Sequence, residues 1–68
     1  MRIKYFGDTD TALVEFSERP VAETREINPN IVIDLDKDGN LVAMTIEHAR
    51  AQANLSEISF TEVVAAPR

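Results

Sequence analysis

The first part of the chain alternates apolar and polar residues with a period of two, which is the pattern of a half-buried β-strand. Residues 1–5 and 12–16 both show it, and a run of turn-forming residues at 7–10 separates them. Antiparallel pairing across that four-residue loop places apolar side chains opposite one another and Arg2 opposite Glu15. The predicted pairs are Met1–Phe16, Ile3–Val14, Tyr5–Ala12, Arg2–Glu15 and Lys4–Leu13.

A second hairpin is predicted from residues 31–36, which are rich in β-branched side chains, and the return segment 41–47. Asp38-Gly39 is a preferred centre for a type I′ turn, in which both central residues need positive φ. A two-residue loop there makes all facing pairs on one side apolar, whereas a three-residue loop would pair Ile33 with Thr45. We therefore predict the pairs Ile31–Ile46, Ile33–Met44 and Leu35–Val42.

The remaining segments are less regular. Residues 21–27 are polar on both sides and bracketed by Pro20 and Pro29, which predicts an edge strand. Residues 48–55 are rich in alanine and free of β-branched residues, which favours a short helix that must dock on the sheet. The tail alternates again from Ile58 to Val63, so it forms a sixth strand, an arm that pairs with a neighbouring subunit, or a frayed end closing near residues 65–67.

The predicted fold class is α+β and mainly β: an antiparallel β-meander of about five strands followed by a short C-terminal helix. Residues 1–55 form one small domain, and residues 56–68 form a tail that is a strand, an arm or partly disordered. The two hairpins carry this prediction because their turn chemistry and their apolar patterns agree.

The short length of the chain suggests that it needs a partner for stability. The chain has 68 residues, no cysteine and a single histidine, His48, so disulfides and thiolate metal sites are excluded. Domains shorter than about 70–80 residues usually need a disulfide, a metal or a partner subunit for stability. We therefore expect self-association, in a protein that is not an enzyme and has no cofactor.

Charge and hydropathy narrow the partners further. The net charge is −5 and the basic residues are scattered, which disfavours nucleic-acid binding. No apolar stretch reaches the length of a signal sequence or a membrane span, so we expect a cytoplasmic protein without membrane contact.

Apolar residues at positions that the pattern assigns to the outside mark a candidate interaction surface, unless the helix docks over that face. We predict a non-enzymatic, homo-oligomeric protein–protein interaction module on this basis. The candidate residues are Leu13, Val32, Leu41, Ile58 and Phe60.

The acidic second hairpin supplies the alternative, a domain that binds a small ligand or a divalent cation. Asp34, Asp36 and Asp38 match the first half of a calcium-binding loop, but the twelfth position, which needs glutamate, is Thr45. We expect a hairpin turn with solvent-facing aspartates, no metal site and no catalytic residue. His48 has no activating neighbour and is expected at the start of the helix or on the surface.

An ordered set of short motifs runs through residues 3–47, and its clearest part is residues 31–42. The segments are Ile3-Lys4-Tyr5, Asp8, Asp10-Thr11-Ala12-Leu13, residues 20–27, residues 31–42 and Ile46-Glu47. This set resembles the domain-of-unknown-function family 2283, which comprises small bacterial and archaeal proteins. The resemblance implies a compact β-meander followed by a short helix, and it implies no activity. It also suggests a second small protein as partner, in an antitoxin-like role.

Overall fold

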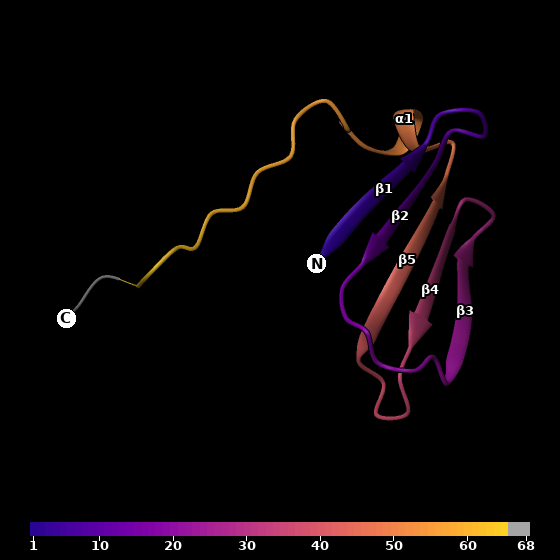
Figure 1. Cartoon of the computed structure of the whole chain (residues 1–68), viewed down its shortest axis with the longest axis vertical. Helices are drawn as coiled ribbons and strands as arrows, with labels where there is room; N and C mark the ends of the chain where they lie inside the picture. The colour runs from indigo at the N-terminus through magenta and orange to yellow at the C-terminus, as the bar shows by residue number, and fades with distance from the viewer. Residues whose placement is uncertain (66–68) are drawn as a thin grey trace.

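A computed structural model describes residues 1–65 of the chain. It contains one antiparallel sheet and one short helix, in agreement with the predicted class (Figure 1). Within residues 1–65, no helix has the length and apolar character needed to cross a membrane. The elements are β1 (Arg2–Phe6), β2 (Thr11–Glu15), β3 (Glu23–Asn28), β4 (Ile31–Leu35), β5 (Leu41–Glu47) and α1 (Ala49–Gln52).

The strands lie in the order β1-β2-β5-β4-β3, so the sheet departs from a strict meander at one connection. β3, β4 and β5 form a meander, but β2 pairs with β5 and leaves β3 at the far edge. The chain from 16 to 22 therefore crosses the end of the sheet (Figure 1). Backbone hydrogen bonds hold it there: Phe16 N–H donates to the Val42 carbonyl at 2.8 Å, and Ala22 N–H donates to the Leu35 carbonyl at 2.8 Å.

The first hairpin has the predicted register. Ile3 opposes Val14, Tyr5 opposes Ala12, and Arg2 opposes Glu15, with the loop at residues 7–10. The four-residue loop and the alternation together predict this register, because a shift of one residue would have moved every apolar side chain to the other face.

The second hairpin corrects two predictions. Asp36 N–H donates to the Asn40 carbonyl at 2.9 Å and Gly39 N–H to the Asp36 carbonyl at 3.1 Å, which closes a three-residue loop over 37–39. Only Gly39 in this loop has positive φ, at 83°, so the turn is type I with a glycine bulge and not type I′. Leu35 consequently opposes Leu41 instead of Val42.

A bulge in β5 explains why the rest of the predicted pairing still holds. The register shifts between Asp34 and Leu35, and one extra residue in β5 restores the phase. Ile33 then opposes Met44 and Ile31 opposes Ile46, as predicted. The longer loop and the bulge compensate each other, a combination that the apolar pattern does not distinguish from a two-residue loop.

The bounds of β3 and α1 differ from the predicted ones: β3 is shifted and α1 is shorter. β3 lies at the edge of the sheet, as predicted, but runs over Glu23–Asn28. α1 is a single turn because Ala53 is extended and the Asn54 side chain accepts hydrogen bonds from the backbone and hydroxyl of Ser56. After residue 56 the chain is extended and runs away from the sheet, so no sixth strand forms within it; residues 66–68 lie outside the described part (Figure 1).

The two glycines make a matched test of the second turn. Gly39→Ala should lower the free energy of unfolding by about 1–2 kcal/mol, because an L side chain is strained at positive φ. Gly7→Ala has ordinary φ and space, with Tyr5 Cε2 at 3.8 Å, so its effect should stay within about 0.5 kcal/mol. Urea unfolding measures both. Equal losses in the two variants would contradict the turn assignment.

Candidate functional site

The sheet has one face that is almost entirely apolar. Side chains of directly opposed residues share a face, so the registers place the apolar alternation of β1, β2, β5 and β4 on one side. On this side the strands carry two charged side chains, Glu23 and Arg25 of β3, which form an ion pair with each other. We call this surface the apolar face; its other members are Ile3, Tyr5, Ala12, Val14, Ile31, Ile33, Leu35, Met44 and Ile46.

The apolar face is covered at its two ends and open between them. Ala12 and Ala49 are fully buried where α1 meets the sheet, and Leu35 is only 6% exposed beside the connection formed by residues 16–22. Between these ends Ile3 remains 37% exposed, and Val14 is half-buried. No large side chain in residues 1–65 is fully buried. The sheet thus lacks the second layer against which such a face normally packs.

The opposite face, which we call the polar face, carries most of the charged side chains of the strands. Glu15 accepts from Arg2 at 2.7 Å and from Lys4 at 3.1 Å, and the Thr24 hydroxyl donates to Asp34 at 2.6 Å. Hydrogen bonding from Lys4, and then from Arg2, holds the pKa of the Glu15 carboxyl below its ordinary value. This face is therefore suited to solvent.

Asp10 fixes α1 against the end of the sheet. The N-cap residue of α1, His48, makes no capping hydrogen bond with its own side chain. Asp10 provides the acceptors instead: its carbonyl accepts from Ala49 N–H at 2.9 Å, and its carboxylate accepts from Arg50 N–H at 3.2 Å. The Tyr5 hydroxyl also donates a hydrogen bond to this carboxylate, at 2.7 Å. This hydrogen bond lowers the pKa of the Asp10 carboxyl.

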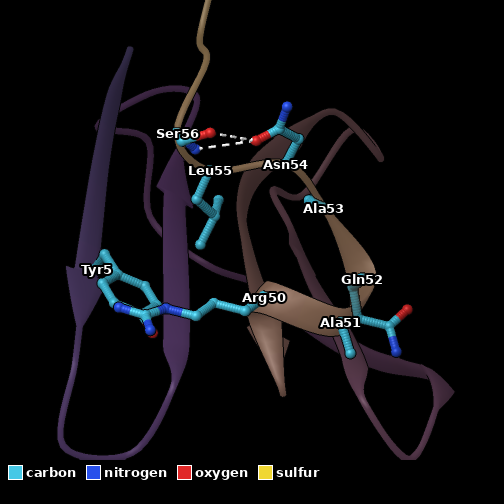
Figure 2. A pocket seen from close by; sticks show the side chains of 8 residues that line it. All are labelled: Tyr5, Arg50, Ala51, Gln52, Ala53, Asn54, Leu55 and Ser56. Carbon is cyan, nitrogen blue, oxygen red and sulfur yellow. Dashed lines mark hydrogen bonds between the residues drawn. The ribbon is translucent and has the colours of Figure 1, made fainter.

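An open depression of about 790 Å³ lies between β1 and the segment that follows α1. Figure 2 shows Arg50 reaching from α1 to Tyr5, with its guanidinium carbon 5.3 Å from the ring centroid, and Leu55 pointing into the same space. Tyr5 and Arg50 are the titratable residues of its lining, and neither is a general base near neutral pH. The depression therefore offers apolar and cation–π contacts, and no set of catalytic groups.

The aspartates of the second hairpin have separate roles. Asp36 is buried, and its Oδ1 accepts from the N–H groups of Asp38 and Asn40, at 2.9 Å each, while Arg19 Nε lies 3.1 Å from its Oδ2. Asp34 is bonded to Thr24 on the polar face. The part of the chain from 1 to 65 contains no group of three or more His, Cys, Asp or Glu side chains placed to hold a metal ion. The prediction that these aspartates all face solvent is wrong for Asp36, because it closes the turn.

The five residues predicted as an interaction surface do not form one surface. Leu13 and Val32 lie half-buried on the polar face, on either side of Thr45. Leu41, predicted to join them, opposes Leu35 across the bulge and is 40% exposed. Ile58 and Phe60 are 63% and 89% exposed in the extended tail. α1 approaches the apolar face at Tyr5.

Sequence reasoning missed the open centre of the apolar face. The alternation assigned Ile3, Val14, Ile33 and Met44 to an interior, and they do share one face. A comparison of helix length with sheet width would have shown the gap. The predicted helix, even over residues 48–55, is too short to cover a five-stranded sheet.

His48 lies where a helix-start residue was predicted and is exposed. It adopts the left-handed region at φ 53°, and its Nδ1 lies 2.9 Å from Asn30 Oδ1. Since Glu47 N–H also donates to the Asn30 carbonyl at 2.7 Å, His48 helps to join the end of β5 to the turn between β3 and β4.

Comparison with known proteins places the chain in a family. The model of a family described as "Protein of unknown function (DUF2283)" matches residues 2–50. The chain belongs to this family. The DUF2283 match covers all the strands and ends within α1, so the extended tail lies beyond it. No curated protein and no solved structure matched the chain.

Asp36 makes the stability of the hairpin depend on pH. The N–H groups of Asn40 and Asp38 hold the pKa of the Asp36 carboxyl below its ordinary value of 3.8, against the effect of burial. A carboxyl whose pKa is lower in the folded state stabilises the fold above its unfolded pKa, and that stabilisation is lost as pH falls through the folded pKa.

We therefore expect the free energy of unfolding to fall as pH drops below about 4, and Asp36→Asn to reduce this acid-dependent loss. Asp38→Asn removes the same charge from the same loop without removing the acceptor of the turn, and is the control. Urea unfolding between about pH 2.5 and 7 measures the effect. An acid-dependent loss that is the same in wild type and Asp36→Asn would contradict the role of Asp36.

Proposed function

We propose that the chain is a non-enzymatic protein–protein interaction module, and that its apolar face binds the apolar face of a second copy. The open row of apolar side chains across the middle of the sheet carries this proposal. Ile3, Val14, Met44 and Ile33 follow one another across the four strands β1, β2, β5 and β4. Ile3 is exposed and the other three are half-buried, and a contiguous apolar surface that water still reaches is typical of an interaction site.

The distribution of charge favours a second copy as the partner. Each chain carries a net charge of −5, so two copies repel each other unless their charges are kept apart. β1, β2, β4 and β5 place no charged side chain on the apolar face, and Glu23 and Arg25 on β3 neutralise each other. Two apolar faces can therefore meet without opposing like charges.

Pairing of two sheets also supplies the missing layer. Two antiparallel sheets packed face to face, about 10 Å apart, form a common two-layer core. A two-fold axis closes such an assembly because each copy presents the same surface to the other. A second small protein in an antitoxin-like arrangement would need an apolar surface complementary to this one, which a second copy already provides.

A charge placed on either face of β5 tests the proposal. Met44→Glu puts a carboxylate on the apolar face and should weaken self-association by roughly 100-fold or more, about 2.7 kcal/mol, because the charge would be buried in the interface. Thr45→Glu adds the same charge one residue further, on the polar face, and should leave the assembly intact. Size-exclusion chromatography with light scattering measures the mass of each variant.

Ile3→Asp provides a second variant, since Ile3 is on the edge strand β1 and 37% exposed, so less packing is disturbed. Circular dichroism shows whether each variant keeps its strands. A wild-type chain that is monomeric at high micromolar concentration, or a Met44→Glu chain that associates as strongly as Thr45→Glu, would overturn the proposal.

A further inference from the structure

The C-terminal segment from 57 to 64 has the composition of a strand but no partner strand among residues 1–65 of its own chain. We call this segment the arm. It is extended and exposed, and it leaves α1 and runs away from the sheet (Figure 1). Its large apolar side chains are mostly exposed to solvent: Ile58 is 63% exposed, Phe60 89%, Val63 87% and Val64 81%. Large apolar residues are usually buried in folded proteins.

We propose that the arm of one copy pairs with the free edge of β1 in a second copy and extends its sheet by one strand. This inference rests on the self-association proposed above and names a second contact within it. β1 is one of the two edge strands, and all its residues are exposed. Addition of an extended segment to an exposed strand edge is a common mode of protein recognition.

The alternation of the arm matches the two faces of β1. With Ile58 and Phe60 beside Ile3 and Tyr5, the arm continues the apolar face by two large side chains. Glu57, Ser59 and Thr61 then fall on the polar face. There Arg2 and Lys4 share the single carboxylate of Glu15, so one positive charge is left over. Glu57 would complete this set of charges.

Charge also separates β1 from the other edge. β1 carries two cations and no anion, whereas β3 carries Glu23 and Glu26 with a single cation, Arg25. The arm carries Glu57 and Glu62 and no cation, so its charge is opposite to that of β1 and the same as that of β3. Since Arg50 lies over Tyr5, the apolar face beside β1 also holds a cation for Glu62.

The dimensions allow the exchange. The five residues from Glu57 to Thr61, which the alternation places beside β1, extend over about 17 Å, the length of that five-residue strand. The arm starts beside α1, and α1 lies on the apolar side of the sheet near Tyr5, which is the side where the second copy docks. A two-fold axis lets each copy donate its arm to the other, so no free β1 edge remains and the assembly is closed.

Intermolecular paramagnetic relaxation tests the exchange directly. The chain has no cysteine, so Ser59→Cys accepts a single nitroxide label. In several-fold excess over isotope-labelled, unmodified chain, the spin-labelled chain should remove most of the amide signal intensity of β1 (Arg2–Phe6) and spare β3 (Glu23–Asn28), because nearly every observed copy then receives the arm of a spin-labelled copy at its β1.

Two controls separate the alternatives. With label and isotope on the same chain, dilution with excess unmodified chain should restore the β1 signals; signals that stay broadened would show the arm folding back on its own β1 and overturn the proposal. Adding Ile58→Asp and Phe60→Asp to the spin-labelled chain should abolish the broadening. Light scattering measures the mass of the assembly in both relaxation experiments.

The two proposals fail differently. A dimer of normal mass with unaffected β1 amides would overturn arm exchange and leave the apolar interface standing, as would equal broadening of β1 and β3. A chain that is monomeric throughout would overturn the apolar interface and the exchange together.

Discussion

A sheet that is apolar on one face is stable only if something removes that face from water, and this constraint governs the whole molecule. Burial of apolar area is the main favourable term in folding, and a chain of this length has little area to bury. Its single-turn helix covers one end of the sheet, and the connection after β2 covers the other. The centre of the apolar face is only half-buried, and we propose that a second copy supplies the missing layer.

The covered ends are held by polar contacts, and these set the shape of what remains open. Asp36 closes the turn between β4 and β5 and pairs with Arg19 on the crossing connection. Asp10 holds the start of α1 from outside the helix. Because each aspartate replaces backbone partners that short elements cannot supply, the sheet is fixed at both ends while its middle is not covered by either. The helix in turn directs the arm away from the sheet.

The sequence predicted the strands better than it predicted what lies over them. Alternation together with the positions of the turn residues predicted the register of the first hairpin and the pairing of Ile33 with Met44, since a shift of one residue would place apolar side chains on the solvent side. It could not reveal the three-residue loop at Gly39 or the bulge in β5. The extra residue in the loop and the extra residue in the strand cancel each other, so the apolar pattern beyond them is unchanged. It also missed the pairing of β2 with β5, which depends on contacts distant in the sequence. The five residues predicted as an interaction surface are dispersed for a related reason: a two-residue period assigns faces but does not say whether a face is covered.

The dependence of thermal stability on chain concentration shows whether a second copy completes the fold. If a second copy supplies the missing layer, folding and association are coupled, and the melting temperature must rise with concentration by mass action. We predict a clear, continuous rise in Tm over roughly a 100-fold range of chain concentration. A sharp transition at a Tm that does not change over that range would show that the single sheet is stable alone, and would contradict the account.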